Sequence, residues 1–405
     1  MTEDLKNNKY VIWLYDVTGH AYNSIYQNFP KQYFDIYDIY NDYSKILEMK
    51  NIKLLDRPDV IICKDGAKLS PELKAVLGES CCTIVYVSNK PNLRETENMV
   101  NHVFEFTSDK VVTNEMKGRN PVTVETTKEK FSIKKITELI QMANVRKIMK
   151  VVKDFAKDER NSMDIISDIE KGKKISSINI EYLRKVGNRL NSFINLKDNY
   201  TYGHCQRVAK YTEVLARGLE LSNEDREKLI LSAELHDIGK LVLPTAVINK
   251  TSKLNDSEFE WMKRHTSLGS VIFPDLQSTN VYGGIRYHHE KFDGSGYEGL
   301  KGSEIPFFGQ IIAIADSFDA MTSQRSYNKV KSAEEAIQDL IQHKGSWYNP
   351  ELVDIFVTEL LKDKKIMHDL EVAKAIADQN YEASHEKDLQ RSDIDKTLLL
   401  KKGGM

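Results

Sequence analysis

Five histidines and two aspartates between positions 204 and 316 are the residues of this chain best suited to chemistry. His236 and Asp237 end an apolar helical pattern and lie just before Gly239. Burying an unpaired carboxylate costs several kcal/mol, so a buried aspartate at this point needs a cation or several hydrogen-bond donors. The remaining members of the set are His204, His265, His288, His289 and Asp316. This concentration of imidazole and carboxylate groups predicts a metal site.

The types of donor atom in this set limit which metal ion it can bind. Neighbours on a helix project about 100° apart, so His236 and Asp237, or His288 and His289, reach one site only at the seam between them or across two ions. A carboxylate can bridge two ions, whereas imidazole ordinarily cannot. Mixed histidine and aspartate ligation favours Fe or Mn, with Zn as an alternative, and the lack of cysteine in the set argues against a structural zinc site.

The composition is that of a globular protein with two or three domains, since 405 residues exceed one ordinary domain. Hydrophobic residues make up 40% and charged residues 29%, and the net charge of −2 indicates no nucleic-acid polymer or anionic membrane as a partner. The polar start of the chain does not fit a signal peptide, and no apolar run approaches the roughly 20 residues of a membrane helix. Four cysteines without CxxC spacing indicate reduced thiols, so we expect a cytoplasmic protein without membrane insertion: Cys63, Cys81, Cys82 and Cys205.

An α/β region precedes the part of the sequence that contains these histidines and aspartates. Five short β-rich runs alternate with helical stretches near 42–50, 70–77 and 91–100, which predicts a parallel, doubly wound sheet in residues 1–110. The runs are Tyr10–Tyr15, Phe34–Tyr40, Asp59–Cys63, Thr83–Val87 and Val103–Phe106.

This region resembles a response-regulator receiver domain in its pattern but lacks the matching chemistry. A receiver carries an acidic pair after its first strand, whereas here Asp16 stands alone. The third strand ends in Lys64, so Asp65 lies one residue after the position of the phosphorylated aspartate in a receiver. Ser88 matches the hydroxyl residue of a receiver. Ser108-Asp109-Lys110 replaces the Lys-Pro expected after the last strand. We expect a degenerate receiver that docks a regulatory protein and carries no phosphate on Asp65.

The rest of the chain is predicted to be helical. Residues 111–186 form a linker with amphipathic helices, which either make a signalling or dimerising stalk or cap the next domain. Residues 187–362 are an all-α domain, and residues 363–405 are a charged tail, a helix with a disordered end.

Residues 187–362 resemble the HD-GYP domain, a branch of the HD metal-dependent phosphohydrolases that cleaves the bacterial messenger cyclic di-GMP. The matching motifs lie at spaced positions along the whole range. They are Asp198-Asn-Tyr-Thr-Tyr-Gly-His204, His236-Asp-Ile-Gly-Lys240, His265, His288-His-Glu-Lys-Phe-Asp-Gly-Ser-Gly-Tyr297, Ile305-Pro306 and Ala315-Asp-Ser-Phe-Asp-Ala-Met-Thr-Ser-Gln-Arg-Ser-Tyr327.

The resemblance implies two divalent metal ions, Fe or Mn first, with Zn, Mg and Ni as alternatives. One ion would be held by His204, His236, Asp237 and Asp316. Asp237, with a catalytic role, would bridge to a second ion held by His265, His288 and His289. A third ion occurs in some members with a glutamate four residues before the first histidine, but that position is Tyr200 here. A phenol is a poor ligand for a hard cation, so we expect two ions.

The resemblance also implies the substrate contacts. Lys240 would act in catalysis as a positive charge beside a phosphate oxygen or the leaving group, and Arg325 would bind substrate phosphates. The other expected contacts are Asp198, Gly294, Gly296 and Tyr297. The chain departs from the family where Gly296-Tyr297-Glu298 replaces Gly-Tyr-Pro, and where Asn328 replaces a lysine. An inward-pointing Glu298 would weaken binding of a dianionic dinucleotide.

Three functions are compatible with these residues. The leading one is a phosphodiesterase that opens cyclic di-GMP to the linear dinucleotide pGpG, or further to GMP, under control of the N-terminal domain. The alternatives are a non-catalytic sensor of a cyclic dinucleotide and an HD phosphohydrolase of a different nucleotide. The complete ligand set favours catalysis, whereas the altered Gly-Tyr-Pro sequence favours the sensor. The helical stalk predicts a homodimer.

Overall fold

The computed structural model describes part of the chain, which divides into two units. The described residues are 9–17, 25–26, 29–39, 58–64, 73, 83–88, 101–105, 116–117, 120–121, 133–158, 180–197, 199–273, 276, 279–324 and 330–379. The first unit comprises Met1–Asn199 with Ile238–Asp275, and the second comprises Tyr200–Asp237 with Leu276–Met405.

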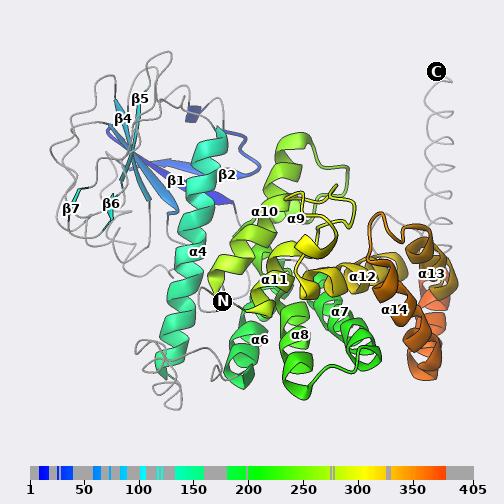
Figure 1. Cartoon of the computed structure of the whole chain (residues 1–405). Helices are drawn as coiled ribbons and strands as arrows, with labels where there is room; N and C mark the ends of the chain where they lie inside the picture. The colour runs from blue at the N-terminus through cyan, green and yellow to red at the C-terminus, as the bar shows by residue number, and fades with distance from the viewer. Residues whose placement is uncertain are drawn as a thin grey trace, which may run out of the picture. The chain divides into compact units, whose positions relative to one another are not determined.

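The first unit contains a parallel five-stranded sheet (Figure 1). Its strands, in the order β2-β1-β3-β4-β5, are β1 (Tyr10–Tyr15), β2 (Phe34–Asp38), β3 (Val60–Lys64), β4 (Thr83–Ser88) and β5 (Asn101–Glu105). This order is that of flavodoxin-like doubly wound sheets. The predicted strands are confirmed to within about two residues, and most side chains of β1 and β3 are buried, as expected for strands covered on both faces. Almost all residues of the predicted connecting helices lie outside the described part, so the receiver-like assignment stays a prediction.

Two details bear on the receiver comparison. Asp16 follows β1 in a left-handed conformation with φ of 55°, and β3 ends at Lys64, as the sequence predicts. Asp65 lies outside the described residues. The predicted linker also contains a short antiparallel pair, β6 (Met116–Lys117) with β7 (Asn120–Pro121), which was not expected.

Helix α4 (Ile133–Asp158) belongs to the core of the first unit. Its buried face, with Ile136, Leu139 and Ile140, shares one hydrophobic cluster with Tyr10 of β1 and with Trp261 of α10 (Asp256–Ile272). The apolar positions recur at helical spacing, so one face of α4 is covered by this cluster. The packing favours the prediction that the helix caps a neighbouring domain; a dimerising stalk stays a prediction.

Shorter helices complete the first unit. They are α6 (Ile180–Lys197), the 3₁₀ helix η6 (Ile238–Val242) and α9 (Thr245–Ile248). Asn255 caps α10: its side chain accepts a hydrogen bond from the backbone N–H of Glu258, and the Glu258 carboxylate accepts one from the N–H of Asn255 at 2.8 Å. This reciprocal pair satisfies two N–H groups that a helix start leaves without intrahelical partners.

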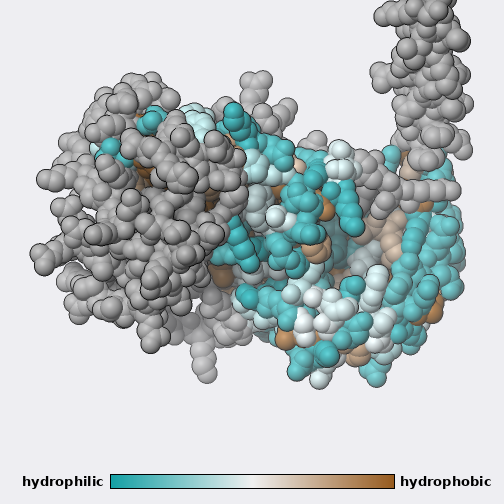
Figure 2. Space-filling view, turned by 90° about the horizontal axis from the view of Figure 1, so that it is seen from above, coloured by the Kyte–Doolittle hydropathy of each residue, from teal (hydrophilic) through white to brown (hydrophobic). Residues whose placement is uncertain are grey.

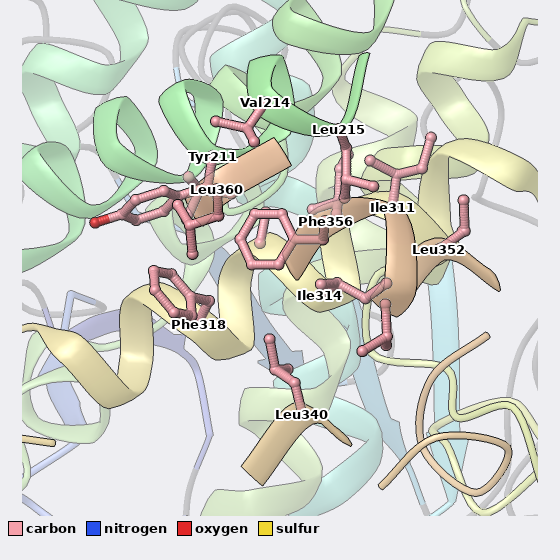
Figure 3. Close-up of a cluster of buried hydrophobic side chains, with 14 of the residues drawn as sticks. Tyr211, Val214, Leu215, Ile311, Ile314, Phe318, Leu340, Leu352, Phe356 and Leu360 are labelled. Atoms are coloured by element: carbon pink, nitrogen blue, oxygen red, sulfur yellow. The ribbon is translucent and has the colours of Figure 1, made fainter. Parts of the chain in front are cut away.

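The second unit is helical and has its own core. It contains α7 (Asn199–Gly218), α8 (Asn223–Leu235), α11 (Asn280–Tyr287), η8 (Gly302–Glu304), α12 (Phe307–Thr322), α13 (Ala333–Gln342) and α14 (Pro350–Lys362). Helix α12 lies in the middle of this core, where Phe318 packs edge-on against Tyr211 of α7 and Phe356 of α14 (Figure 3). This packing fixes the side of α12 on which Asp316 and Asp319 lie.

Ser222 caps α8 by accepting a hydrogen bond from the N–H of Asp225. Residues 364–379 of the predicted tail are helical. Among the described residues no helix has the length and apolar character needed to cross a membrane. On the face shown in Figure 2, the described residues are mostly hydrophilic, with hydrophobic residues in small separate spots.

Candidate metal centre

The candidate centre in the second unit is built from the ends and inner faces of four helices. His204 lies on α7, His236 is the C-cap of α8 and is followed by Asp237, His288 is the C-cap of α11, and Asp316 lies on α12. The histidines and Asp237 are buried, and the Asp316 side chain is 14% exposed. Helix ends therefore deliver the adjacent pairs that the sequence singles out.

Three predicted ligands of one ion lie together. His204, His236 and Asp316 each offer a ligand atom within 4.8 Å of the others. Nε2 of His204 lies 3.1 Å from Oδ1 of Asp316 and 3.7 Å from Oδ2 of Asp237. Nε2 of His236 lies 3.4 Å from the same Asp237 oxygen. These atoms converge from separate helices on one small volume, as a metal site requires.

The tautomers of the buried histidines suit metal binding. Nδ1 of His236 donates to the carbonyl of Ala233 at 2.7 Å, and Nδ1 of His288 donates to the carbonyl of Ile285 at 2.9 Å. A carbonyl can only accept, so Nδ1 carries the proton and Nε2 keeps its lone pair. In the described part of the chain no group hydrogen-bonds the buried Nε2 of His236. A divalent cation fits this donor set.

A second carboxylate, Asp319, supports His204 from behind. Its Oδ2 accepts a hydrogen bond from Nδ1 of His204 at 2.7 Å, and its Oδ1 accepts one from Nε of Arg207 at 2.6 Å. Asp319 is fully buried and lies one helical turn after Asp316 on α12. No role was predicted for Asp319 from the sequence, although a second aspartate three residues after Asp316 in an apolar helix was a usable signal.

The electrostatics of the centre are dominated by its carboxylates. Burial lowers the pKa of His204, but hydrogen bonds to Asp316 and Asp319 outweigh burial and raise it to about 9. Burial raises the pKa of Asp316, but the hydrogen bond and charge of His204 hold it well below its usual range. The pKa of His288 is well below its usual value because of burial and the neighbouring histidines. A positive charge is therefore favoured on His204, between Asp316 and Asp319, and disfavoured on His288.

The imidazole rings continue from this cluster towards the glycine-rich loop. Ring centroids are 4.8 Å apart for His236 and His288, 4.2 Å for His288 and His289, and 4.7 Å for His289 and Tyr297. Tyr297, a predicted substrate contact, thus lies against a predicted ligand. Burial raises its pKa, so its hydroxyl is protonated at neutral pH.

Cys205 was predicted only as a reduced thiol, yet it lies near the centre. Its sulfur, His236 and Asp237 form a second group whose ligand atoms lie within 4.8 Å of one another. The spacing of the sequence gave no reason to expect this, because Cys205 simply follows His204 on α7.

Several predicted site residues belong to the first unit or lie outside the described residues. His265 on α10 and Lys240 in η6 belong to the first unit, so their part in a centre with His288 and His289 stays a prediction. His265 is buried, and its Nδ1 donates to the carbonyl of Met262 at 2.6 Å, which leaves Nε2 as the ligand atom. Asp198 and Arg325 lie outside the described residues.

Comparison with known proteins places this region in a family. Residues 189–352 match the HD domain family, inside the predicted 187–362 range, and this segment is an HD domain. The chain is 38% identical over 181 residues to a cyclic di-GMP phosphodiesterase of Thermotoga maritima, covering 44% of this chain and 49% of the relative. It is 34% identical over 175 residues to the cyclic di-GMP phosphodiesterase response regulator RpfG of Xanthomonas campestris, covering 42% and 46%.

The name of a third relative gives a different cyclic dinucleotide as its substrate. The 3'3'-cGAMP-specific phosphodiesterase 3 of Vibrio cholerae is 34% identical over 172 residues, covering 42% of this chain and 37% of the relative. The chain thus spans half or less of the length of these relatives. The resemblance to the HD-GYP group is confirmed for the HD domain, and these relatives are named as cyclic-dinucleotide phosphodiesterases.

Proposed function

We propose that the chain is a metal-dependent phosphodiesterase that hydrolyses cyclic di-GMP to the linear dinucleotide pGpG. The observation that carries the proposal is the convergence of His204, His236 and Asp316, with Asp237 beside them, inside an HD domain. Relatives named as cyclic di-GMP phosphodiesterases support the substrate class. Further cleavage of pGpG to GMP is a second step that the same site can perform.

Each proposed ligand has a defined task. His204, His236, Asp237 and Asp316 would hold one divalent ion, and Asp237 together with His265, His288 and His289 would hold a second, as the family resemblance implies. When bound, such ions lower the pKa of water and neutralise charge on phosphate oxygens. The neutral Nε2 atoms and ionised carboxylates supply the charge balance that Fe or Mn prefers.

The remaining residues act on the substrate. Water attacks one phosphorus of the ring, the P–O3' bond breaks, and the leaving oxygen takes up a proton, which gives a 5'-phosphate and a 3'-hydroxyl. Lys240 stabilises the developing negative charge, and Arg325 and Asp198 bind the dinucleotide. Tyr297, whose ring packs against His289, borders the space in which a base or ribose would lie, with Gly294 and Gly296 allowing close approach of the backbone.

We propose that the N-terminal domain regulates this activity through contacts within the first unit. The Tyr10 hydroxyl on β1 donates to the carbonyl of Val242 at 3.0 Å, and Gln141 on α4 donates to the Tyr10 oxygen at 3.1 Å. Val242 ends η6, which begins one residue after Asp237. A partner that shifts the sheet would therefore pull on the segment that follows a metal ligand. Docking of a regulatory protein and a homodimer remain parts of this proposal.

The test compares nucleotides on the purified, full-length protein loaded separately with Fe and Mn. Cyclic di-GMP, 3'3'-cGAMP and cyclic di-AMP are incubated with it, and products are separated by chromatography. We expect pGpG from cyclic di-GMP, two metal ions per chain, and loss of both metal and turnover in His236→Ala. Faster hydrolysis of 3'3'-cGAMP than of cyclic di-GMP would show that the proposed substrate is wrong. Tight binding of a dinucleotide without turnover in both metal forms would indicate a sensor.

A further inference from the structure

The loop after His289 is fixed by its own backbone. Glu290 is buried, and its carboxylate accepts hydrogen bonds from the N–H groups of Glu298 at 2.7 Å and Leu300 at 2.9 Å. A Cβ atom on Gly296 would lie 2.5 Å from Cα of Glu290, so the loop packs directly on the chain that follows the histidine pair. Gly294 has φ of 85° and Gly299 has φ of 82°, conformations that favour glycine. These contacts hold Tyr297 against His289.

Glu298, which replaces the proline of the family pattern, points to Arg286. Nη2 of Arg286 lies 2.9 Å from Oε1 and 3.1 Å from Oε2 of Glu298. The Tyr282 hydroxyl accepts a further hydrogen bond from Nη1 of Arg286 at 3.3 Å. The guanidinium thus has carboxylate and phenol partners that keep its direction fixed.

This direction is away from the ligand His288. Arg286 precedes His288 by two positions, which on a helix corresponds to about 200° of rotation. Tyr297 and Glu298 are neighbours in the loop, yet the Tyr297 ring packs in a tilted arrangement against His289 whereas Glu298 reaches Arg286 on α11. The carboxylate next to the substrate contact is therefore neutralised and turned aside.

The pair itself adds little to the stability of the loop. The Arg286 and Glu298 side chains are 25% and 31% exposed, and ion pairs this exposed contribute little to stability because water and salt screen them. The hydrogen bonds to the buried Glu290 carboxylate are charge-assisted and roughly twice as strong as neutral ones. Glu290 and the glycines hold the loop, so the contribution of Arg286 is electrostatic.

We propose that Arg286 is a positioning residue that neutralises Glu298 and keeps this carboxylate from repelling the dianionic substrate. The inference rests on the proposed function, because it concerns the affinity of the same site for an anionic dinucleotide. The pairing with Arg286 explains why a glutamate at position 298, where the family pattern has proline, is compatible with an anionic substrate. Arg286 acts through Glu298 and does not itself touch the substrate.

The test is a double-mutant cycle in the full-length, metal-loaded protein. We expect Arg286→Met, which keeps the apolar stem, to raise KM for cyclic di-GMP roughly 3- to 10-fold with kcat within about 2-fold, because the loss is that of a screened charge interaction. Glu298→Gln and the double variant Arg286→Met/Glu298→Gln should both stay within about 2-fold of the wild-type KM. The effect of Arg286→Met should shrink at high salt.

A second readout, independent of turnover, is hydrogen exchange of the 290–301 segment. Arg286→Met should leave exchange within about 3-fold of wild type, whereas Glu290→Gln should accelerate it at least about 10-fold. Three results would overturn this inference and leave the proposed function standing. They are an equal rise of KM in Arg286→Met and in the double variant, no rise of KM in either variant, and accelerated hydrogen exchange in Arg286→Met. A wild-type protein that neither binds nor hydrolyses any cyclic dinucleotide would overturn it together with the proposed function.

Discussion

Lys147 of α4 and Asp59, which precedes β3, form a buried ion pair inside the first unit. Nζ of Lys147 lies 2.7 Å from Oδ1 of Asp59, and the two side chains are 0% and 5% exposed. The other carboxylate oxygen accepts a hydrogen bond from the N–H of Val11 at 2.8 Å. One aspartate thus joins β1, the start of β3 and a helix almost ninety residues later in the chain.

Removing the charge of Lys147 should destabilise the first unit strongly. Lys147→Met leaves Asp59 buried without its cation, and breaking a buried pair in this way costs about 3–5 kcal/mol. Denaturant unfolding followed by tryptophan fluorescence measures this, since Trp13 and Trp261 are buried in the first unit. Lys134→Met on the exposed side of the same helix is the matched control and should change the unfolding free energy by less than about 0.5 kcal/mol. Equal effects of the two variants would contradict the pairing.

Gly239 should tolerate no side chain. A Cβ atom there would lie 1.9 Å from the carbonyl oxygen of His265 and 2.7 Å from the N–H nitrogen of Gly269, both backbone atoms that cannot move aside. We expect Gly239→Ala to push η6 from α10 and to lower the melting temperature by several degrees, about 2–4 °C per kcal/mol for a domain of this size.

Gly203→Ala is the control for that experiment. Its Cβ would lie 3.1 Å from Nη1 of Arg207, the end of a flexible side chain, and the residue is in helix α7. Alanine is the better helix former, so stability should be unchanged or rise by up to about 1 kcal/mol. If Gly239→Ala melted like Gly203→Ala, the close packing of η6 on α10 would be wrong.

The sequence predicted the elements well where local pattern decides them. The run Tyr10–Tyr15 is bounded by Asp16 and matches β1 at both ends, and Ser222 and Asn255 cap the helices that they precede. Each of these depends on residues within one or two turns of the chain. Hydrophobic period and capping chemistry are enough to place such elements.

The long-range pairings could not be read from local pattern. A lysine in an amphipathic helix is usually solvent-exposed, so nothing near Lys147 predicts burial beside Asp59. The direction of Glu298 was left open for the same reason: its partner Arg286 lies twelve residues earlier, on a helix. The ligand set was predicted because the family motifs name it, whereas the support from Asp319 emerges only when α7 and α12 are packed together.

Acid should weaken the first unit through Glu258. Burial raises the pKa of Glu258, but hydrogen bonds from Lys250, from the Tyr33 hydroxyl and from the N–H of Asn255 outweigh burial and lower it. A folded-state pKa below the unfolded value of about 4.3 contributes stability that is present above that value and is lost as pH falls through the folded pKa. The stability of this unit should therefore fall as pH decreases below about 5.

The variant Glu258→Gln isolates this contribution. It should lose about 1–3 kcal/mol at pH 7, because charge-assisted hydrogen bonds at the start of α10 are removed, and should approach wild type in acid. Denaturant unfolding between pH 3 and 7 measures both changes. Glu260→Gln, at an exposed position on α10, should follow the wild-type pH dependence. A constant gap between Glu258→Gln and wild type at every pH would rule out the ionised carboxylate as the cause.

The affinity of the centre for metal should depend on Asp319, which no motif assigned as a ligand. Its carboxylate accepts the Nδ1 proton of His204, which orients the ring and makes Nε2 a stronger donor to a cation. Asp319→Asn keeps the size of the side chain but removes the negative charge, so we expect metal affinity to fall about 10- to 100-fold. Competition with a chromophoric chelator, using Mn²⁺ and the full-length protein, measures this affinity without reference to turnover.

The control is Asp339→Asn. Asp339 lies on α13, is partly exposed and pairs with Lys331, so this variant should bind Mn²⁺ as wild type does. Affinity within 2-fold of wild type for a folded Asp319→Asn protein would mean that His204 needs no carboxylate behind it.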